Sequence, residues 1–231
     1  MTVAAIVPAA GRGERLGPGV PKAMRQLGGT PMLVHAVRGM LSARLVDLVV
    51  VAAPPGDEAE VLSVLTTHDI GKEVRVIAGG ATRQDSVRRA LESLPADVDV
   101  VLVHDAARPL TPSEIADAVV QKVRAGFDAV VPGLPVADTI KRVDADRVVT
   151  ETLRRSELVA VQTPQGFTRE LLAKAHDAAV VDGFEASDDA GLAERIGASV
   201  TVVAGSDEAF KVTRPADLVF AEALLRERRA R

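Results

Sequence analysis

Short apolar runs alternate with longer segments of helical periodicity along this chain. The runs are rich in valine, are bounded by Gly, Pro or Asp, and cover residues 3–7, 48–53, 74–77, 98–103, 129–131 and 200–203. Strands that are apolar at successive positions are typical of a parallel sheet covered on both faces. The pattern therefore predicts an α/β fold with a single Rossmann-like, mostly parallel sheet flanked by helices.

Helix-start signals lie between several of these runs. Residues with capping or first-turn preferences mark four helix starts. Thr82 with Asp85 begins a helix through Leu94, and Thr111-Pro112-x-Glu114 begins another with Pro112 as its first helical residue. Ser187 precedes a helix to about Ile196, and Pro215 begins a C-terminal helix. The last helix ends in arginines, which suit the negative pole of the helix dipole.

One stretch, from about residue 134 to 160, breaks this alternation. It reads as irregular or extended, with many charges and a few β-branched residues. A long excursion between core elements is usually functional. We therefore expect a protruding β-arm here, on a single domain covering residues 1–231.

Composition excludes several classes of protein. The 231 residues are 47% hydrophobic and carry a net charge of −4, which argues against nucleic-acid and membrane surfaces as partners. Cysteine is absent, so disulfides, thiolate catalysis and cysteine-bound zinc are excluded. No apolar run has the length of a membrane span, and the N-terminal run follows no basic region, so we expect a strand there rather than a signal peptide. A cytoplasmic protein is the default expectation.

A loop of small residues follows the first apolar run. It reads Pro8-Ala9-Ala10-Gly11-Arg12-Gly13-Glu14-Arg15-Leu16, and Pro21-Lys22 comes soon after. Small residues allow close approach of a phosphate to the backbone. The loop lacks the third glycine of the dinucleotide fingerprint and the G-K-[ST] of a Walker A loop. A tight strand-to-helix turn is one interpretation; two cations, Arg15 and Lys22, favour a triphosphate site.

Further motifs follow in order along nearly the whole chain. They are Ala78-Gly79-Gly80-x-x-Arg83-x-Asp85-Ser86, Val103-His104-Asp105-Ala106-Ala107-Arg108-Pro109, Asp138-Thr139-Ile140-Lys141, Thr163-Pro164-Gln165-Gly166-Phe167, Ser187-Asp188-Asp189-Ala190 and Phe210-Lys211-Val212-Thr213. With the glycine loop, this combination closely resembles the 2-C-methyl-D-erythritol 4-phosphate cytidylyltransferases of the non-mevalonate isoprenoid pathway. We expect no second pathway enzyme fused to it.

The resemblance implies a reaction between CTP and 2-C-methyl-D-erythritol 4-phosphate that gives the CDP-activated alcohol and pyrophosphate. The attacking phosphate oxygen is already ionised at neutral pH, so no general base is required. A cytidylyltransferase for another polyol phosphate, such as ribitol 5-phosphate, and a non-catalytic nucleotide-binding protein are the alternatives. One fold hosts many functions, so the fold cannot choose among them.

Asp105 is the expected metal ligand. It ends a buried strand, at the sheet edge where ligands gather, and Mg²⁺ (other divalent cations being possible) takes one or two carboxylates together with substrate oxygens. The alternative is that Asp105 caps the next turn. For the neighbouring His104 we expect a packing or polar role.

The resemblance also assigns the nucleotide site. Catalytic cations that neutralise the reacting phosphates are Arg15, Lys22 and Lys211. Residues around the nucleotide are Pro8, Ala9, Ala10, Gly11, Gly13, Gly79, Gly80, Ser86 and Ala106. A plain strand-to-helix turn with a helix cap would also contain residues of the types found at Gly79, Gly80 and Ser86.

The expected substrate-binding residues are Arg108, Thr139, Arg155 and Ser187. A phosphomonoester needs such dispersed cations and hydroxyls. Serine at 187 departs from the threonine of the family and could act only as a helix cap, and Arg154 competes with Arg155 for the assigned role. Asp188 and Asp189 are interpreted as acids at a helix start, not as ligands.

The arm is expected to pack on another surface, since it has too few apolar residues for a core of its own. In the resembled family it clasps the partner subunit, so we expect a C₂ homodimer in which Arg155 faces the partner's nucleotide site. The alternative is a lid over its own site.

Overall fold

The computed structural model describes residues 2–11, 21–70 and 74–230 of the chain. The predictions at Gly13 and Arg15 lie outside these residues. Within them, one sheet has the order β10-β7-β11-β6-β1-β4-β5, with β12 also beside β7. The bounds are β1 (Thr2–Pro8), β4 (Leu48–Ala53), β5 (Val74–Ala78), β6 (Val98–Val103), β7 (Ala129–Pro135), β10 (Val159–Val161), β11 (Gln165–Thr168) and β12 (Val200–Ala204).

Most of the sheet is parallel. Strands β5, β4, β1 and β6 run parallel to one another, and β12 runs parallel to β7. The short strand β11 lies antiparallel between β6 and β7, and β10 pairs antiparallel with the end of β7. The predicted α/β sheet is thus confirmed, with antiparallel pairing confined to the part beyond β6.

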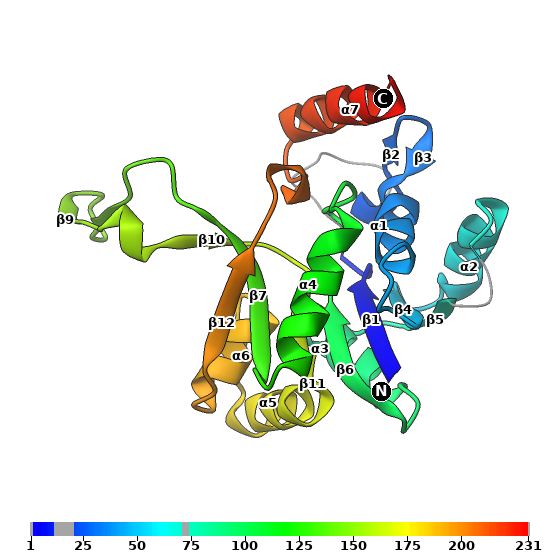
Figure 1. Cartoon of the computed structure of the whole chain (residues 1–231), viewed down its shortest axis with the longest axis horizontal. Helices are drawn as coiled ribbons and strands as arrows, with labels where there is room; N and C mark the ends of the chain where they lie inside the picture. Colours follow the sequence, from blue (N-terminus) through cyan, green and yellow to red (C-terminus); the bar gives the residue numbers. More distant parts are fainter. Residues whose placement is uncertain (1, 12–20, 71–73, 231) are drawn as a thin grey trace.

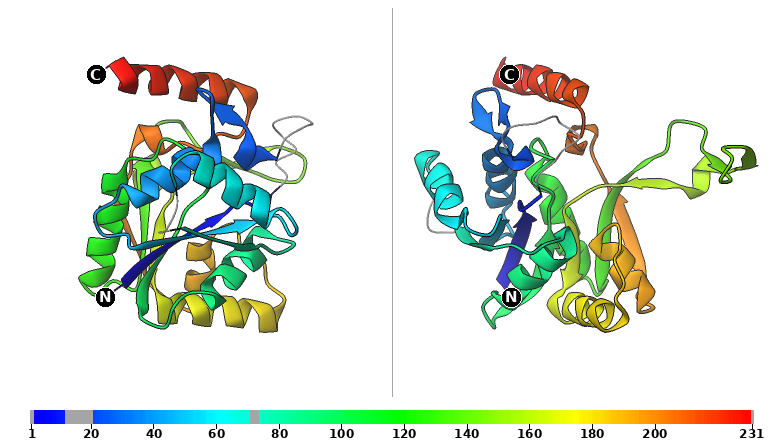
Figure 2. Two further views of the ribbon diagram at one scale, coloured as in Figure 1. Left: turned by 90° about the vertical axis from the view of Figure 1, so that its right-hand side faces the viewer. Right: turned by 180° about the vertical axis from the view of Figure 1, so that it is seen from behind.

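Helices cover both faces of the sheet (Figures 1 and 2). One apolar cluster joins alternate β1 side chains to α1 (Met32–Leu41), α2 (Glu58–Thr67) and α4 (Ser113–Arg124). A second joins the intervening side chains to α3 (Arg83–Glu92), α5 (Arg169–Asp182) and α6 (Asp189–Arg195). The mostly apolar character of the predicted strands is explained by this two-sided burial. A smaller cluster seats α7 (Pro215–Ala230) beside Leu27 and Leu110.

Strand predictions agree with the structure where the apolar run is long. The runs at 48–53 and 98–103 match β4 and β6 end for end, and the other four are parts of longer strands. β11 was not predicted. It is only four residues long and mixes polar and apolar side chains, so it lacks the apolar signal.

The helix caps were predicted in part. The Thr82 side chain accepts a hydrogen bond from the Asp85 amide (3.0 Å), as expected for a cap. Pro112 is the residue before α4 rather than its first residue. At α6 the cap is Asp188, whose carboxylate accepts from the Gly191 amide (3.0 Å), so Ser187 is not the cap. A carboxylate one residue later displaced the hydroxyl that the sequence pattern favoured.

The excursion forms a protruding arm, as predicted (Figure 1). Strands β8 (Lys141–Val143) and β9 (Val149–Thr152) pair as an antiparallel hairpin, and a short 3₁₀ helix, η3 (Arg155–Glu157), precedes β10. The hairpin side chains are exposed, including Val143 and Val149. In Figure 1 and in the right-hand view of Figure 2 the arm leaves the body of the molecule rather than folding over it.

No helix in the described part of the chain is both long and apolar enough to cross a membrane.

Candidate active site

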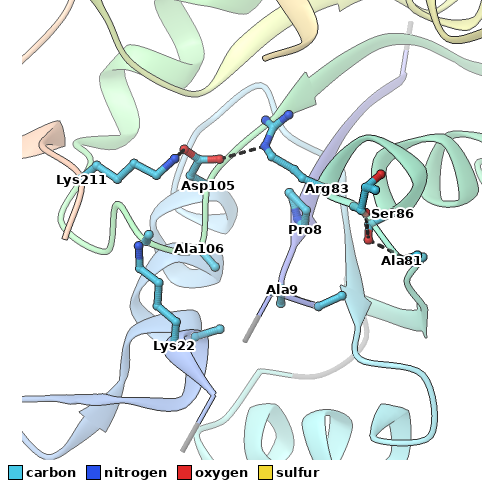
Figure 3. Close-up of a pocket in the computed structure, with 15 residues that line it drawn as sticks. Pro8, Ala9, Lys22, Ala81, Arg83, Ser86, Asp105, Ala106 and Lys211 are labelled. Carbon is cyan, nitrogen blue, oxygen red and sulfur yellow. Dashed lines mark hydrogen bonds and ion pairs between the residues drawn. The ribbon is translucent and has the colours of Figure 1, made fainter. Parts of the chain in front are cut away.

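A pocket opens at the carboxyl ends of β1 and β6, near the middle of the sheet (Figure 3). Open α/β sheets bind ligands in this position. The predicted nucleotide residues Pro8, Ala9, Ala10, Gly11, Gly80, Ser86 and Ala106 line the pocket together with Lys22, Asp105 and Lys211. Segments from β1, α3, β6 and the chain before α7 thus meet at one place, although they lie far apart in the sequence.

Gly79 lies just behind this pocket, where the backbone leaves no room for a side chain. Its amide donates to the carbonyl of Ala53 (2.7 Å), and an added Cβ would lie 2.9 Å from both that oxygen and the Cβ of Ala10. The glycine is therefore required by the close approach of the two loops.

The Ser86 hydroxyl holds the neighbouring loop together. It accepts a hydrogen bond from the Gly80 amide (3.0 Å) and donates to the carbonyl of Thr82 (2.8 Å). Ser86 is buried, and its donor is already used within the loop. The geometry therefore gives the hydroxyl a positioning function for the loop backbone, beside the base contact that the sequence suggested.

Lys22 and Lys211 bring two ammonium groups to the pocket (Figure 3). Lys22 begins the 3₁₀ helix η2 (Lys22–Met24), and Lys211 follows the 3₁₀ helix η4 (Asp207–Ala209). The amide of Val212, next to Lys211, donates to the Ala107 carbonyl (2.8 Å), which fixes this segment beside the end of β6. Two cations on the wall of one pocket suit a polyphosphate ligand.

Asp105 is the most strongly held side chain of the site. Its backbone amide donates to the hydroxyl of Thr163 (3.0 Å). Its carboxylate lies 2.8 Å from Nζ of Lys211, 3.3 Å from Nε of Arg83 and 3.7 Å from Nε of Arg108. Burial alone would raise the pKa of this carboxyl, but the charges of Arg83 and Lys211 outweigh burial and hold the pKa well below its usual range. Asp105 is therefore a carboxylate at neutral pH.

His104 is fully buried and does not line the pocket. Its Nδ1 lies 3.0 Å from the Thr163 hydroxyl. Burial lowers its pKa to about 4, so the imidazole is neutral at pH 7. These observations support a packing and polar role, as the sequence suggested, and place no basic group of His104 in the site.

A second, smaller pocket adjoins the first and shares Arg83, Asp105 and Lys211 with it. Two of the four predicted substrate residues, Arg108 and Ser187, line this second pocket. Arg108 is also anchored, because its guanidinium donates to the carbonyls of Ala209 (2.6 Å) and Val161 (3.4 Å).

The other two predicted substrate residues lie on the arm. Thr139 and Arg155 are exposed and line neither pocket of their own chain. The guanidinium of Arg155 donates to the Ala137 carbonyl (3.0 Å), within the arm. Arg154, the alternative to Arg155, pairs instead with Glu157 (3.4 Å).

The two acids at the start of α6 differ in their surroundings. Asp188 accepts hydrogen bonds from the Gly191 amide and from the amide group of Gln165 (2.7 Å). Asp189 is buried and pairs with Arg83 (2.7 Å) and His176 (3.1 Å). Both are helix-start acids, as the sequence suggested, but Asp188 also lines the second pocket and Asp189 is tied to the site through Arg83.

Arg83 is the residue of the site that the sequence analysis left without a role. It stood in a quoted motif, yet its partner Asp189 is 106 residues away in the sequence. The only sequence signal was an arginine directly after a helix cap, which is a common surface pattern.

The donor set around Asp105 can be tested for a metal ion. Among the described residues, no group of three or more His, Asp or Glu side chains could hold one. A single carboxylate beside a cationic pocket suits an ion that takes its other ligands from phosphate oxygens and water, which is the habit of Mg²⁺.

The chain resembles known enzymes along nearly its whole length. The family model for 2-C-methyl-D-erythritol 4-phosphate cytidylyltransferase matches residues 3–227. The enzyme of that name from Streptomyces avermitilis is 55% identical, over 98% of this chain and 92% of its own length. The enzyme of that name from Frankia casuarinae is 58% identical, over 96% of this chain and 81% of its own length. The enzyme of that name from Thermus thermophilus, whose crystal structure is known, is 39% identical in sequence. Its structure matches this one with a TM-score of 0.80, and the match covers 98% of this chain and all of that one. On this evidence the chain belongs to the 2-C-methyl-D-erythritol 4-phosphate cytidylyltransferase family.

Proposed function

We propose that this protein transfers the cytidylyl group of CTP to the phosphate of 2-C-methyl-D-erythritol 4-phosphate. The observation that carries the proposal is the pair of adjoining pockets with one shared wall of Arg83, Asp105 and Lys211. One pocket collects the predicted nucleotide residues and the other collects Arg108 and Ser187. Two phosphorylated substrates bound side by side would meet at the shared wall.

The reaction is an in-line displacement. A phosphate oxygen of the polyol substrate forms a bond to the α-phosphorus of CTP, the bond from that phosphorus to the bridging oxygen breaks, and pyrophosphate leaves. Because the attacking oxygen is ionised, no side chain has to remove a proton. The site agrees with this chemistry, since the only histidine beside Asp105 is neutral and buried.

Positioning and charge neutralisation are therefore the contributions of the protein. Lys22 and Lys211 neutralise the reacting phosphates. Arg15, which is not among the described residues, is proposed to neutralise them as well. Gly79, Gly80 and Ser86 shape the loop against the base. Arg108 and Ser187 hold the polyol phosphate.

Asp105 is proposed to hold Mg²⁺ together with phosphate oxygens of CTP, other divalent cations being possible. When bound, the ion would neutralise negative charge on the triphosphate. Replacing Asp105 with Asn should abolish magnesium-dependent turnover while keeping the fold, checked by circular dichroism and by activity across a magnesium titration. Near-normal activity at limiting Mg²⁺ would contradict the metal assignment.

The arm is proposed to complete the site of a partner subunit in a C₂ homodimer. Thr139 and Arg155 line neither of the two adjoining pockets of their own chain, and exposed valines at 143, 148, 149, 159 and 161 accompany them along the arm and its base. A cytoplasmic location goes with this proposal, as for an enzyme acting on small phosphorylated metabolites.

A substrate screen tests the proposed activity. The protein is incubated with each of four nucleoside triphosphates and with 2-C-methyl-D-erythritol 4-phosphate or ribitol 5-phosphate, and pyrophosphate release is measured. We expect turnover with CTP and the methylerythritol phosphate. Turnover with ribitol 5-phosphate alone would indicate the other polyol, and CTP binding without turnover on any pair would indicate a non-catalytic nucleotide-binding protein.

A further inference from the structure

Arg83 lies at the junction of the two pockets and lines both. It is the first residue of α3, and its side chain is 30% exposed. Its guanidinium contacts two carboxylates from different parts of the chain, Asp105 after β6 and Asp189 at the start of α6. Figure 3 shows Arg83 reaching Asp105 from the side opposite to Lys211.

The outer contact of Arg83 is buried and fixed. Nη1 of Arg83 donates to Oδ2 of Asp189 (2.7 Å), and the side chain of Asp189 is only 1% exposed. The other oxygen of Asp189, Oδ1, lies 3.1 Å from Nε2 of His176, which is equally buried in α5. Arg83 and His176 hold the pKa of Asp189 below its usual value against the opposing effect of burial. The carboxylate of Asp189 is therefore charged and held from both sides.

The inner contact separates the two oxygens of Asp105. Oδ1 faces Nε of Arg83 (3.3 Å), whereas Oδ2 faces Nζ of Lys211 (2.8 Å) and Nε of Arg108 (3.7 Å). Lys211 has a flexible stem and is 40% exposed, so it can turn toward a phosphate. Arg83 cannot follow, because its other nitrogen is committed to Asp189.

We propose that Arg83 is a positioning residue for the reaction: anchored by Asp189 and His176, it fixes Oδ1 of Asp105 so that Oδ2 faces the reacting phosphates. The inference rests on the proposed function and adds three residues to it. Arg83 acts through Asp105 and keeps that carboxylate in place when Lys211 moves to the substrate.

The fork of an arginine is needed for this arrangement. Nε and Nη1 point to two different acids, and a planar guanidinium offers several donors in fixed directions. A lysine at 83 would supply the same charge through one nitrogen. Arg83→Lys therefore separates a positioning role from simple charge neutralisation.

The experiment compares Arg83→Gln, Arg83→Lys and Asp189→Asn with the wild-type chain. The kcat for CTP and the methylerythritol phosphate is divided by the number of CTP-binding sites found by calorimetry, which removes any effect of misfolded protein. We expect kcat per site to fall roughly 10–100-fold in all three variants, the range for losing a group that orients a ligand of a site. The KM for CTP should change much less, because the nucleotide residues 8–11, Gly80 and Ser86 are not substituted.

The matched control is Asp182→Asn. Asp182 pairs with Arg195 (2.9 Å), so it joins the same two helices, α5 and α6, without reaching the site. This variant should keep the wild-type kcat. A crystal structure of Arg83→Gln gives a second readout, in which the Asp105 carboxylate should turn away from its wild-type orientation.

Wild-type kcat per site in Arg83→Gln, recovery of activity in Arg83→Lys, or a change confined to the KM for CTP would each overturn the inference. An unchanged orientation of the Asp105 carboxylate in the crystal structure of Arg83→Gln would also overturn the inference, and this test does not depend on turnover. Failure of the wild-type protein to release pyrophosphate would instead overturn the proposed function. If Asp189→Asn does not fold, the variants at Arg83, whose side chain is only partly buried, carry the test.

Discussion

Lys22 and Lys211 face the same pocket from different segments of the chain, and Lys211 pairs with Asp105. An ammonium group that meets charge developing on a phosphate should contribute more to the transition state than to the bound ground state. Lys22 lines the nucleotide pocket, whereas Lys211 lines both pockets. The charge of each lysine can therefore be removed and tested separately.

The first prediction concerns Lys22. Lys22→Met keeps the length and apolar stem of the side chain and removes the charge, so kcat should fall roughly 10²–10³-fold, the scale for losing one preorganised charge donor. Steady-state kinetics with varied CTP would measure it. A variant that raises only the KM for CTP would show instead that Lys22 binds the ground state and transition state equally.

His104 gives a prediction for the pH dependence of stability. Burial lowers its pKa from 6.5 to about 4, so between these values the unfolded chain binds a proton that the folded chain does not. The free energy of unfolding should therefore fall as the pH drops through this window. Urea unfolding at several pH values would show the slope.

The control variant for this pH dependence is His104→Gln, which removes the titrating group. Its free energy of unfolding should depend less on pH over the same window. Burial also lowers the pKa of His35, so part of the slope should remain. Equal slopes in the two proteins would refute the assignment to His104.

At the scale of elements, the start of α3 links stability to the site. The Thr82 cap precedes Arg83 directly, and Ser86 on the first turn closes the nucleotide loop. Any loosening of this helix start would disturb both pockets.

The prediction for this element is that Thr82→Ala lowers the free energy of unfolding by about 1 kcal/mol, the typical effect of losing a side-chain cap. The Asp85 amide would lose its acceptor. Thr82→Ser keeps the hydroxyl and should retain most of the stability. Urea unfolding of both variants measures the difference, and equal losses would show that the methyl group, not the hydrogen bond, matters.

The elements that the sequence predicted share one physical property. β4 and β6 are buried on both faces, so all their positions but Asp99 are apolar and the ends of each strand are visible in the pattern. β11 depends on its neighbours for its pairing, since it is only four residues long and contains Gly166, a residue type disfavoured in strands. Local patterns reveal burial, whereas pairing of a short polar strand is set by tertiary contacts.

The site was predictable to a similar extent. The glycine loop and Asp105 come from short motifs next to strand ends, and the structure brings residues 8–11 of that loop together with Asp105 in one pocket. The role of Arg83 depends on Asp189, which is 106 residues away in the sequence, so no local sequence pattern indicates the contact. The placement of Arg155 away from its own pockets required the path of the arm in space.

At the scale of the whole molecule, the arm separates residues of the proposed site from their own pockets. Figure 1 shows the hairpin of β8 and β9 well outside the body. An exposed hairpin of this size cannot form a core by itself, so it should pack on another surface.

The prediction is that subunits share sites. Co-expressing an Arg155→Ala chain with a Lys22→Met chain should restore activity that neither variant has alone. In a mixed dimer, one site combines an intact body with an intact arm from the partner. Pyrophosphate release by the purified mixture measures the recovery.

The opposite outcomes are equally definite. If the arm serves its own chain as a lid, every site in the mixture carries a defect and activity stays absent. Sedimentation of the wild-type protein as a monomer would end the dimer proposal directly.

The wall common to the two pockets has a thermodynamic consequence. Asp105 and Lys211 border both cavities, so a ligand that redistributes charge between them in one cavity alters the electric field in the other. Linkage then requires reciprocity: the factor by which bound CTP changes the affinity for the polyol phosphate equals the factor by which the polyol phosphate changes the affinity for CTP. The two substrates are coupled through the shared pair even before any bond between them is made.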